Sequence, residues 1–277
     1  LLVKIGKYTN QEDKKGRRRI MKIVVLSGGL STERDVSLAS GAGICRTLRE
    51  RGHRAVLLDV FLGLPNAPEN LEEVFDMPNG NLEIAEGIKT SAPDIAAIKA
   101  SRADKSDCFF GPNVIELCRM ADIAFLGLHG GYGEDGRLQA AFDLLGIKYT
   151  GPNSFGNALA MDKSVTKQIF KMNDVPTPNG TWLFENTKDT PLADLGLSLP
   201  VVVKPCLGGS SIGVYICHTP EEYQAALDAS FPQEYCVMIE EYIKGREFAC
   251  GILDGKALPV IEIIADGNYD YENKYDI

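Results

Sequence analysis

The sequence predicts an α/β domain with a parallel sheet, followed by an α+β region with antiparallel sheet. Near the N-terminus a strand, a glycine loop, a helix and a second strand follow one another. That order forms a βαβ unit and therefore a parallel sheet. After Gly151-Pro152 the pattern changes to apolar strands joined by turn residues, with single helices between them. The 277 residues are sufficient for two domains, or three small ones, each with its own core.

The elements of the first half can be placed in order along the chain. Residues 23–27 predict a buried strand, and Thr32 with an aspartate three residues later has the pattern of a helix N-terminal cap. Helical spacing continues to Gly52, which offers a left-handed stop, and 55–60 predicts the second strand. A further buried strand is expected at 123–129.

The pattern is weak between the second and third of these strands. Residues 61–120 hold proline, asparagine and aspartate punctuation and one weak helix at about 112–120. We therefore expect an elaborated connection there and not a separate domain. After the third strand, a polar glycine loop leads into a helix predicted at about 136–145.

The second half predicts helices and antiparallel strands. A helix at about 162–173 leads to 175–178, which must be extended because of its prolines. Thr219 begins another helix, with proline at the first helical position and glutamate three residues after the cap. Strands are predicted on both sides of a Gly/Ser loop in 201–217, at 235–243, at 246–253, and at 257–264 after the hairpin signal Asp254-Gly255. The polar residues 269–277 predict no element.

Composition excludes several classes of function. The formal net charge of −9 argues against a broad nucleic-acid surface, because phosphate backbones require clustered Lys and Arg. One cluster of basic residues precedes Met21. We interpret this stretch as sequence upstream of the folded protein, and a nucleic-acid-binding or targeting tail is the alternative. Seven cysteines form no C-x-x-C pair and no metal-type spacing, which suits a reducing compartment. No signal peptide or membrane-length apolar run is visible, so we expect a cytoplasmic protein without a membrane partner.

The segment VVVKPCLGGSSIGVYIC at 201–217 sets Lys204 and a glycine-serine loop between two strands. Backbone N–H groups in such loops favour anions, although no G-K-[ST] follows the glycines as in a Walker A motif. By itself the segment predicts a hairpin with a surface lysine. Lys163 at a helix start, the glutamates of 240–247 and His129 after a buried strand also have ordinary interpretations, as surface charge, edge-strand charge and a structural histidine.

In their order and spacing, however, these segments resemble the D-alanine–D-alanine ligases, members of the ATP-grasp superfamily. The resemblance runs from Met21 to the last residue. The segments that carry it are GGLSTERDVS (28–37), LHGGYGEDG (128–136), YTGPN (149–153), ALAMDK (158–163), VVVKPCLGGSSIGV (201–214) and YDYENKY (269–275).

The resemblance implies a division of the chain into four segments. We expect a polar N-terminal extension at 1–20 and an α/β substrate-binding domain at 21–150. A central ATP-grasp subdomain at 151–241 and the start of an incomplete C-terminal ATP-grasp subdomain at 242–277 follow.

For the nucleotide, the resemblance implies that Lys163 and Lys204 hold the phosphates of ATP beneath a loop that folds over them. The loop residues are Gly208, Gly209, Ser210 and Ser211. The segment that reads adenine would consist of Glu240, Glu241, Tyr242 and Ile243, with Glu247 as the ribose carboxylate. Where the family commonly has a lysine after the first of these glutamates, this chain has Glu241, which leaves the adenine contact in doubt at that position.

For the amino-acid substrate, the resemblance implies that Glu33 takes the ammonium group of the first D-alanine. A carboxylate suits that position because a buried ammonium without a charged partner is costly. His129 would lie beside the same substrate, and Ser210 and Tyr275 would link to Glu33 by hydrogen bonds and close the site. Glu33, Ser210 and Tyr275 are thus the implied catalytic set, and Lys274 and Tyr275 belong to a substrate-binding loop. The tyrosine also resembles enzymes that form the dipeptide, in contrast to those that form D-alanyl-D-lactate.

The implied reaction makes D-alanyl-D-alanine for bacterial peptidoglycan in two steps, with ATP and Mg²⁺. In this family the Mg²⁺ ligands lie downstream of the loop that contains Tyr275, so no metal ligand is assigned in this chain. We therefore expect a truncated ligase with little turnover, and a homodimer through the N-terminal domain. Another ATP-grasp carboxylate–amine ligase and an inactive nucleotide-binding module are the alternatives.

Overall fold

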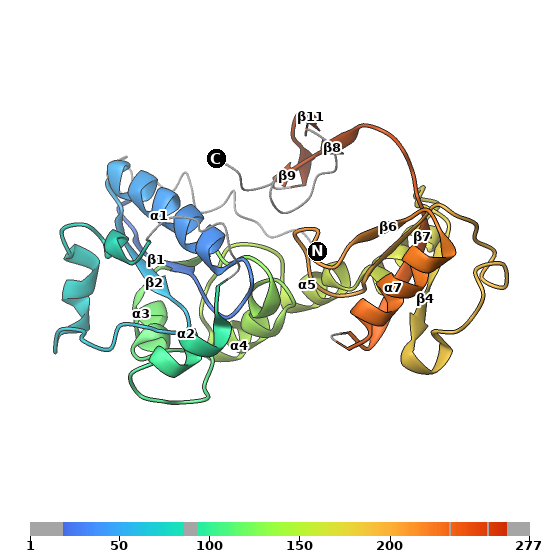
Figure 1. Cartoon of the computed structure of the whole chain (residues 1–277). Coiled ribbons are helices and arrows are strands. Elements are labelled where there is room, and N and C mark those ends of the chain that lie inside the picture. The colour runs from blue at the N-terminus through green and yellow to red at the C-terminus, as the bar shows by residue number, and fades with distance from the viewer. Residues whose placement is uncertain (1–18, 86–92, 233, 254, 265–277) are drawn as a thin grey trace. The chain divides into compact units, whose positions relative to one another are not determined.

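The computed structural model describes residues 19–85, 93–232, 234–253 and 255–264 (Figure 1). By their contacts, these residues divide into two units. Of the described residues, unit 1 contains those from 19 to 157 together with those from 252 to 258. Unit 2 contains those from 158 to 251 and those from 259 to 264. Each unit has its own sheet.

Unit 1 is built on a parallel sheet of β1 (Lys22–Ser27), β2 (Arg54–Asp59) and β3 (Ile123–Leu126), in the order β2-β1-β3. The helix α1 (Arg34–Glu50) connects the first two strands, as the βαβ pattern predicts. After their first residues, β1 and β2 are buried throughout. This is the pattern of strands that are covered on both faces.

Alternating residues of β1 supply the two cores of unit 1. Ile23 and Val25 pack with α1, whereas Val24 and Leu26 pack on the opposite face. That second face is covered by α3 (Val114–Met120) and α4 (Arg137–Leu145). Two layers of helix therefore enclose the sheet (Figure 1), and full burial of each such side chain contributes roughly 1.5 to 3 kcal/mol.

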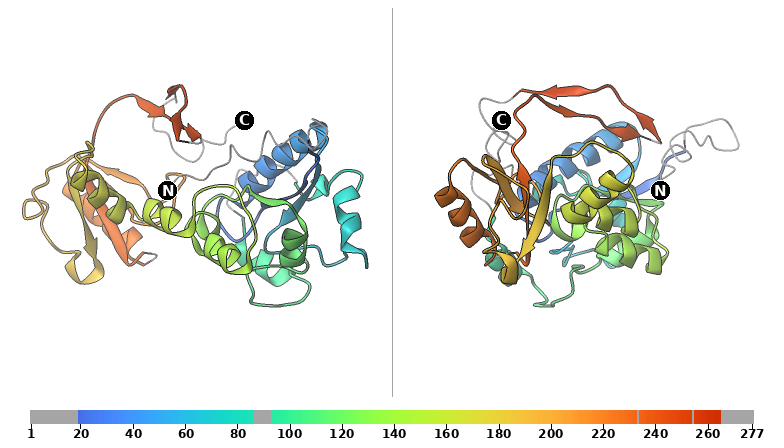
Figure 2. Two further views of the ribbon diagram at one scale, coloured as in Figure 1. Left: turned by 180° about the vertical axis from the view of Figure 1, so that it is seen from behind. Right: turned by 90° about the vertical axis from the view of Figure 1, so that its right-hand side faces the viewer.

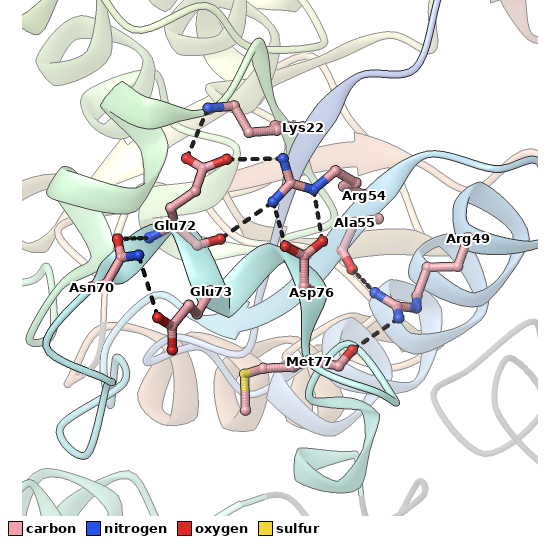
Figure 3. Close-up of polar contacts among 9 residues, drawn as sticks. All are labelled: Lys22, Arg49, Arg54, Ala55, Asn70, Glu72, Glu73, Asp76 and Met77. Carbon is pink, nitrogen blue, oxygen red and sulfur yellow. Dashed lines mark hydrogen bonds and ion pairs between the residues drawn. The ribbon is translucent and has the colours of Figure 1, made fainter.

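The connection between β2 and β3 contains η2 (Leu71–Asp76), η3 (Leu82–Ile84) and α2 (Ile95–Ser101), in addition to α3. Long-range ion pairs hold its first part to the sheet (Figure 3). Arg54 pairs with Glu72 at 2.8 Å and with Asp76 at 2.6 Å, and Lys22 reaches Glu72 at 3.1 Å. Arg49 donates to the carbonyl oxygens of Ala55 and Met77.

The start of α1 corrects one expectation from the sequence. The N-cap residue is Glu33 and not Thr32, and no side chain caps the helix. Ser31 lies at the turn instead, because its carbonyl accepts from Arg34 N and its hydroxyl from Glu33 N. The aspartate at 35 falls in the first turn of the helix, where a carboxylate favours the positive end of the helix dipole.

Unit 2 contains an antiparallel sheet in the order β4-β7-β5-β6. The helix α7 (Pro220–Ser230) covers one face of this sheet (Figure 2). It begins with the predicted capping box of Thr219 and Glu222. Two further helices come before the first strand of the sheet. The bounds are α5 (Ser154–Met161), α6 (Lys163–Met172), β4 (Gly180–Phe184), β5 (Val201–Pro205), β6 (Tyr215–Cys217) and β7 (Cys236–Glu241).

The remaining strands are shorter than the sequence predicts. The strand expected at 246–253 is divided into β8 (Glu247–Ala249) and β9 (Ile252–Leu253). That expected at 257–264 is divided into β10 (Lys256–Ala257) and β11 (Ile261–Ile263). Gly251 and Pro259 stand at the two interruptions, and proline cannot donate to a ladder. β9 pairs with β10 and β8 with β11, both antiparallel, so the hairpin signal is confirmed although Asp254 lies outside the described residues. The fold class, a parallel α/β region followed by antiparallel α+β, is confirmed.

Candidate functional site

The alternation of side chains along two neighbouring strands creates a polar patch on the sheet of unit 2. Val201 and Val203 of β5 pack toward α7, so Lys204 points to the opposite face. On β7 the same alternation turns Ile239 to the core and Glu240 to the face of Lys204. The register pairs Lys204 with Met238 and Val202 with Glu240, which makes the lysine and the glutamate diagonal neighbours.

Lys204 and Glu240 form an ion pair through Oε2 of the carboxylate. The other oxygen, Oε1, accepts from Lys167 of α6 at 2.6 Å. The side chains of Lys167 and Glu240 are nearly buried, whereas that of Lys204 is 24% exposed. Burial opposes ionisation of Glu240, but the hydrogen bonds from Lys167 and Lys204 outweigh it and hold the pKa of Glu240 below its ordinary value.

Lys163 is the first residue of α6, and Asp162 caps that helix by accepting from Ser164 N and Val165 N. The ammonium group of Lys163 donates to the Gly208 carbonyl at 2.8 Å, and its backbone N–H donates to the Cys206 carbonyl at 2.9 Å. Burial is the main cause that lowers the pKa of Lys163, and the positive charge of Lys204 adds to it. Lys163 and Lys204 thus bring two ammonium groups near each other, which suits an anionic ligand, and Asp162 and Glu234 offset part of the charge of Lys163.

The loop between β5 and β6 has an unusual backbone. Gly208 and Gly213 adopt positive φ, and so do Ser210 at +52° and Ser211 at +58°. A left-handed conformation costs a residue with a Cβ roughly 1 to 2 kcal/mol. Such strain gathers at functional sites, and turns of this kind can direct successive N–H groups at an anion.

The segment expected to read adenine continues from β7. Glu241 accepts from the backbone N–H of Asn179 at 2.8 Å, so its carboxylate holds the start of β4. Tyr242 donates its N–H to the Pro200 carbonyl at 3.1 Å, and the side chain of Ile243 is exposed. Glu247 is exposed at the start of β8, which belongs to a separate two-stranded sheet.

In unit 1 the loops after β1 and β3 enclose a cavity of about 210 Å³. Its lining includes Gly28, Gly29, Ser31, His129 and Gly130. Ser31 donates its hydroxyl to the His129 carbonyl at 2.6 Å, which ties the two loops together.

Glu33 is buried beside this cavity. A Cβ at Gly130 would lie 2.5 Å from Oε2 of Glu33, so the glycine lets the second loop approach the carboxylate. Glu33 and His129 therefore come from two loops that meet. Ser210 belongs to unit 2 and is described only within it, and Lys274 and Tyr275 lie outside the described residues.

Sequence reasoning assigned no role to three buried charges, two in unit 1 and one in unit 2. Arg34 pairs with Asp59 and donates to the Gly29 carbonyl at 2.7 Å, while Oδ1 of Asp59 accepts from Phe61 N and Leu62 N. This pair fixes the glycine loop after β1. The third is Lys167 in unit 2, which lies one helical turn after Lys163 and whose partner Glu240 is distant in the sequence.

Two searches of the described part of the chain gave negative results. No group of three His, Cys, Asp or Glu residues there could hold a metal ion. Among the same residues no helix has both the length and the apolar character needed to cross a membrane.

Comparisons with known proteins follow the same division of the chain. The family model described as "D-ala D-ala ligase N-terminus" matches residues 22–152, and that described as "D-ala D-ala ligase C-terminus" matches 181–277. A D-alanine–D-alanine ligase of Lacticaseibacillus casei is 41% identical over 258 residues, 92% of this chain and 71% of the relative. One of Pediococcus pentosaceus is 42% identical, over 92% of this chain and 72% of its own length.

Solved structures give the same result. The D-alanine–D-alanine ligase of Bacillus anthracis matches with a TM-score of 0.63 and 32% identity, over 92% of this chain and 69% of that one. The same enzyme complexed with ATP matches with a TM-score of 0.64 and 29% identity, over 90% and 67%.

Proposed function

Because the chain belongs to the D-alanine–D-alanine ligase family, we propose that it joins two D-alanine molecules to D-alanyl-D-alanine at the expense of ATP. The observation that carries this proposal is the partly buried group of Lys163, Lys204 and Glu240 beside the strained loop of 208–213. Two neighbouring ammonium groups beside a loop whose N–H groups can face an anion suit a triphosphate. The product would serve bacterial peptidoglycan synthesis.

On the nucleotide side, Lys163 and Lys204 would neutralise phosphate oxygens, and the N–H groups of the loop of Gly208, Gly209, Ser210 and Ser211 would cover them. Phosphoryl transfer depends mostly on such positioning and charge neutralisation. The adenine would lie along 240–243, with Glu247 toward the ribose. Since the Glu241 carboxylate accepts from Asn179 N and the Glu241 N–H donates to the Asn179 carbonyl, we assign no adenine contact to the side chain or the N–H of Glu241.

On the amino-acid side, the cavity of unit 1 would take the first D-alanine. Glu33 would accept its ammonium group, and His129 would lie beside it. Ser210 and Tyr275 stay proposed members of the catalytic set, as the family resemblance implies. A carboxylate already buried against Gly130 is well suited to a cationic partner.

The chemistry follows from these positions. A carboxylate oxygen of the first D-alanine attacks the γ-phosphorus of ATP, the bond to the bridging oxygen breaks, and an acyl phosphate and ADP form. The amine of the second D-alanine then attacks the acyl carbon, loses a proton and expels phosphate. The described residues do not supply a Mg²⁺ site, so no step is assigned to the metal, whose ligands we expect outside them.

Three further features belong to the proposal. The domain boundaries would lie near 21, 151 and 242, and two copies would associate through the N-terminal domain. We place the protein in the cytoplasm, because the reaction consumes ATP. The chain spans 71% of the length of its Lacticaseibacillus relative.

The test separates nucleotide binding from ligation. ATP binding to this chain is measured by calorimetry, and ADP formation is measured with D-alanine, with L-alanine and without amino acid. We expect ATP to bind, and any ADP formation to require D-alanine. ADP formation that ignores D-alanine, or that requires another amine, would favour another ATP-grasp ligase. Binding without any amino-acid effect favours an inactive nucleotide-binding module, and absence of ATP binding contradicts the proposal.

A further inference from the structure

Lys167 is a buried lysine for which the nucleotide site provides no direct role. It lies on α6 one turn after Lys163, and its side chain is only 2% exposed. Its ammonium group donates to Thr177 Oγ1 at 3.1 Å, to the Pro178 carbonyl and to Glu240 Oε1 at 2.6 Å. An ammonium group has three donors, so all of them are used inside the protein. Lys167 therefore has no hydrogen left for a ligand.

Glu240 is shared between two lysines that differ in their surroundings. Lys204, on Oε2, is partly exposed and can meet a ligand from solvent. Lys167, on Oε1, cannot do so. A phosphate at this site would compete with Glu240 for Lys204, because a phosphate oxygen and a carboxylate oxygen are both strong acceptors for an ammonium group.

If Lys204 were the only cation paired with Glu240, its transfer to a phosphate would leave the Glu240 carboxylate unpaired. A carboxylate that stays buried after losing its cation is strongly unfavourable. Lys167 removes that cost, since it keeps Oε1 paired whichever way Lys204 turns. Lys167 of α6 also joins the segment before β4, through Thr177 and Pro178, to β7, through Glu240.

We propose that Lys167 is a positioning residue for nucleotide binding, which holds Glu240 in place so that Lys204 can exchange the carboxylate for a phosphate. This inference rests on the proposed ATP site. Lys167 itself touches neither the phosphates nor the reacting atoms.

The first test is the variant K167M, which keeps the length of the side chain and removes its charge. The matched control is K171M on the same helix, because Lys171 is exposed. Its ammonium group makes one long hydrogen bond, 3.5 Å to the Gly180 carbonyl. Calorimetry with ATP should show binding to K167M weakened by about 10- to 100-fold, the range found when groups that orient the ligands of a metal ion are removed. K171M should bind as the wild type does.

A second measurement distinguishes positioning from simple packing. The charged groups that face Glu240 among the described residues are Lys167 and Lys204, and its cross-strand neighbours Gly180 and Val202 carry no charge. Without Lys167, burial should raise the pKa of Glu240. In K167M the protonated form of Glu240 is then easier to bury than the charged form. The loss of folding stability in K167M should therefore be largest at neutral pH, where Glu240 is charged. The deficit should shrink as the pH falls through the raised pKa that Glu240 has in K167M. The double variant K167M/E240Q should recover stability and lose this pH dependence.

The outcomes are separable. If the wild type binds ATP and K167M binds it equally well, the positioning role is wrong while the proposed function stands. A stability deficit in K167M that does not change with pH and is not relieved by E240Q would make Lys167 a packing residue, and would overturn the inference as well. If the wild type itself does not bind ATP, the proposed function fails and this inference fails with it.

Discussion

The surroundings of Lys163 favour the neutral form of its side chain. Burial and the positive charge of Lys204 both lower the pKa of its ammonium group, whereas a bound phosphate would favour the charged form. ATP affinity should therefore fall as the pH rises through the pKa of Lys163, over a pH range below that in which an ordinary lysine titrates. In K163R the guanidinium stays protonated over that range, so the fall should be smaller. Calorimetric titrations at several pH values measure both profiles, and identical profiles would contradict a phosphate contact at Lys163.

Burial should also divide the seven cysteines by reactivity. It raises the pKa of Cys45 to about 11 and that of Cys118 to about 12, and it raises those of Cys206, Cys217 and Cys236 as well. Only the thiolate reacts with a disulfide reagent. At about pH 8 we therefore expect rapid labelling of the exposed Cys108 and Cys250, and of the other five only after unfolding. Mass spectrometry of the labelled peptides assigns each site, and rapid labelling of Cys206 in the native protein would mean that the edge of β5 opens readily.

At the scale of residues, the sequence allowed prediction of those site residues that stand in a recognisable local motif. Lys204 stands before a glycine loop and Lys163 at a helix start, and both patterns can be recognised in a single segment. Lys167 could not be identified in the same way, because its role depends on Glu240, 73 positions further along the chain. The pairing of Arg34 with Asp59 likewise depends on two segments that only the folded sheet brings together.

The loop between β5 and β6 tests whether an element acts through its backbone. Ser211 has φ of +58°, a conformation that glycine adopts without strain and that valine strongly resists. If the N–H groups of the loop hold the phosphates, S211G should bind ATP nearly as the wild type does and S211V should bind it much more weakly. Calorimetry on both variants measures this. A large loss in S211G would instead assign the contact to the serine hydroxyl.

Elements were predictable where their pattern is local. The capping box at Thr219 gave the start of α7, and alternation in the β5 and β7 segments would have placed Lys204 and Glu240 on one face. The cap predicted at Thr32 was wrong because Ser31 hydrogen-bonds the turn instead. The η helices between β2 and β3 were missed, since η2 is held by ion pairs from Lys22 and Arg54 that no local pattern reveals (Figure 3).

At the scale of the whole molecule, the residues proposed for the nucleotide and those proposed for the first amino acid lie in different units. The fold class was predictable because a βαβ unit and a hairpin-rich region have different periodicities, and both belong to long, strongly apolar segments. Lys163, Lys204 and Glu240 lie in unit 2, whereas Glu33 and His129 lie in unit 1. The two proposed ligands should therefore protect different segments of the chain from hydrogen exchange.

Hydrogen exchange followed by mass spectrometry can measure this protection. ATP should slow exchange first in α6, in the β5–β6 hairpin and in β7, because ligand binding stabilises the residues that it contacts against local opening. D-alanine should act on the loops at 28–33 and 129–133, which border the cavity of unit 1. The variant K171M provides the control for the ATP effect, since its exchange pattern should match that of the wild type. Protection by ATP that appears in the β1–α1 region and spares α6 would assign the nucleotide to unit 1, because a ligand protects most strongly the elements that hold it.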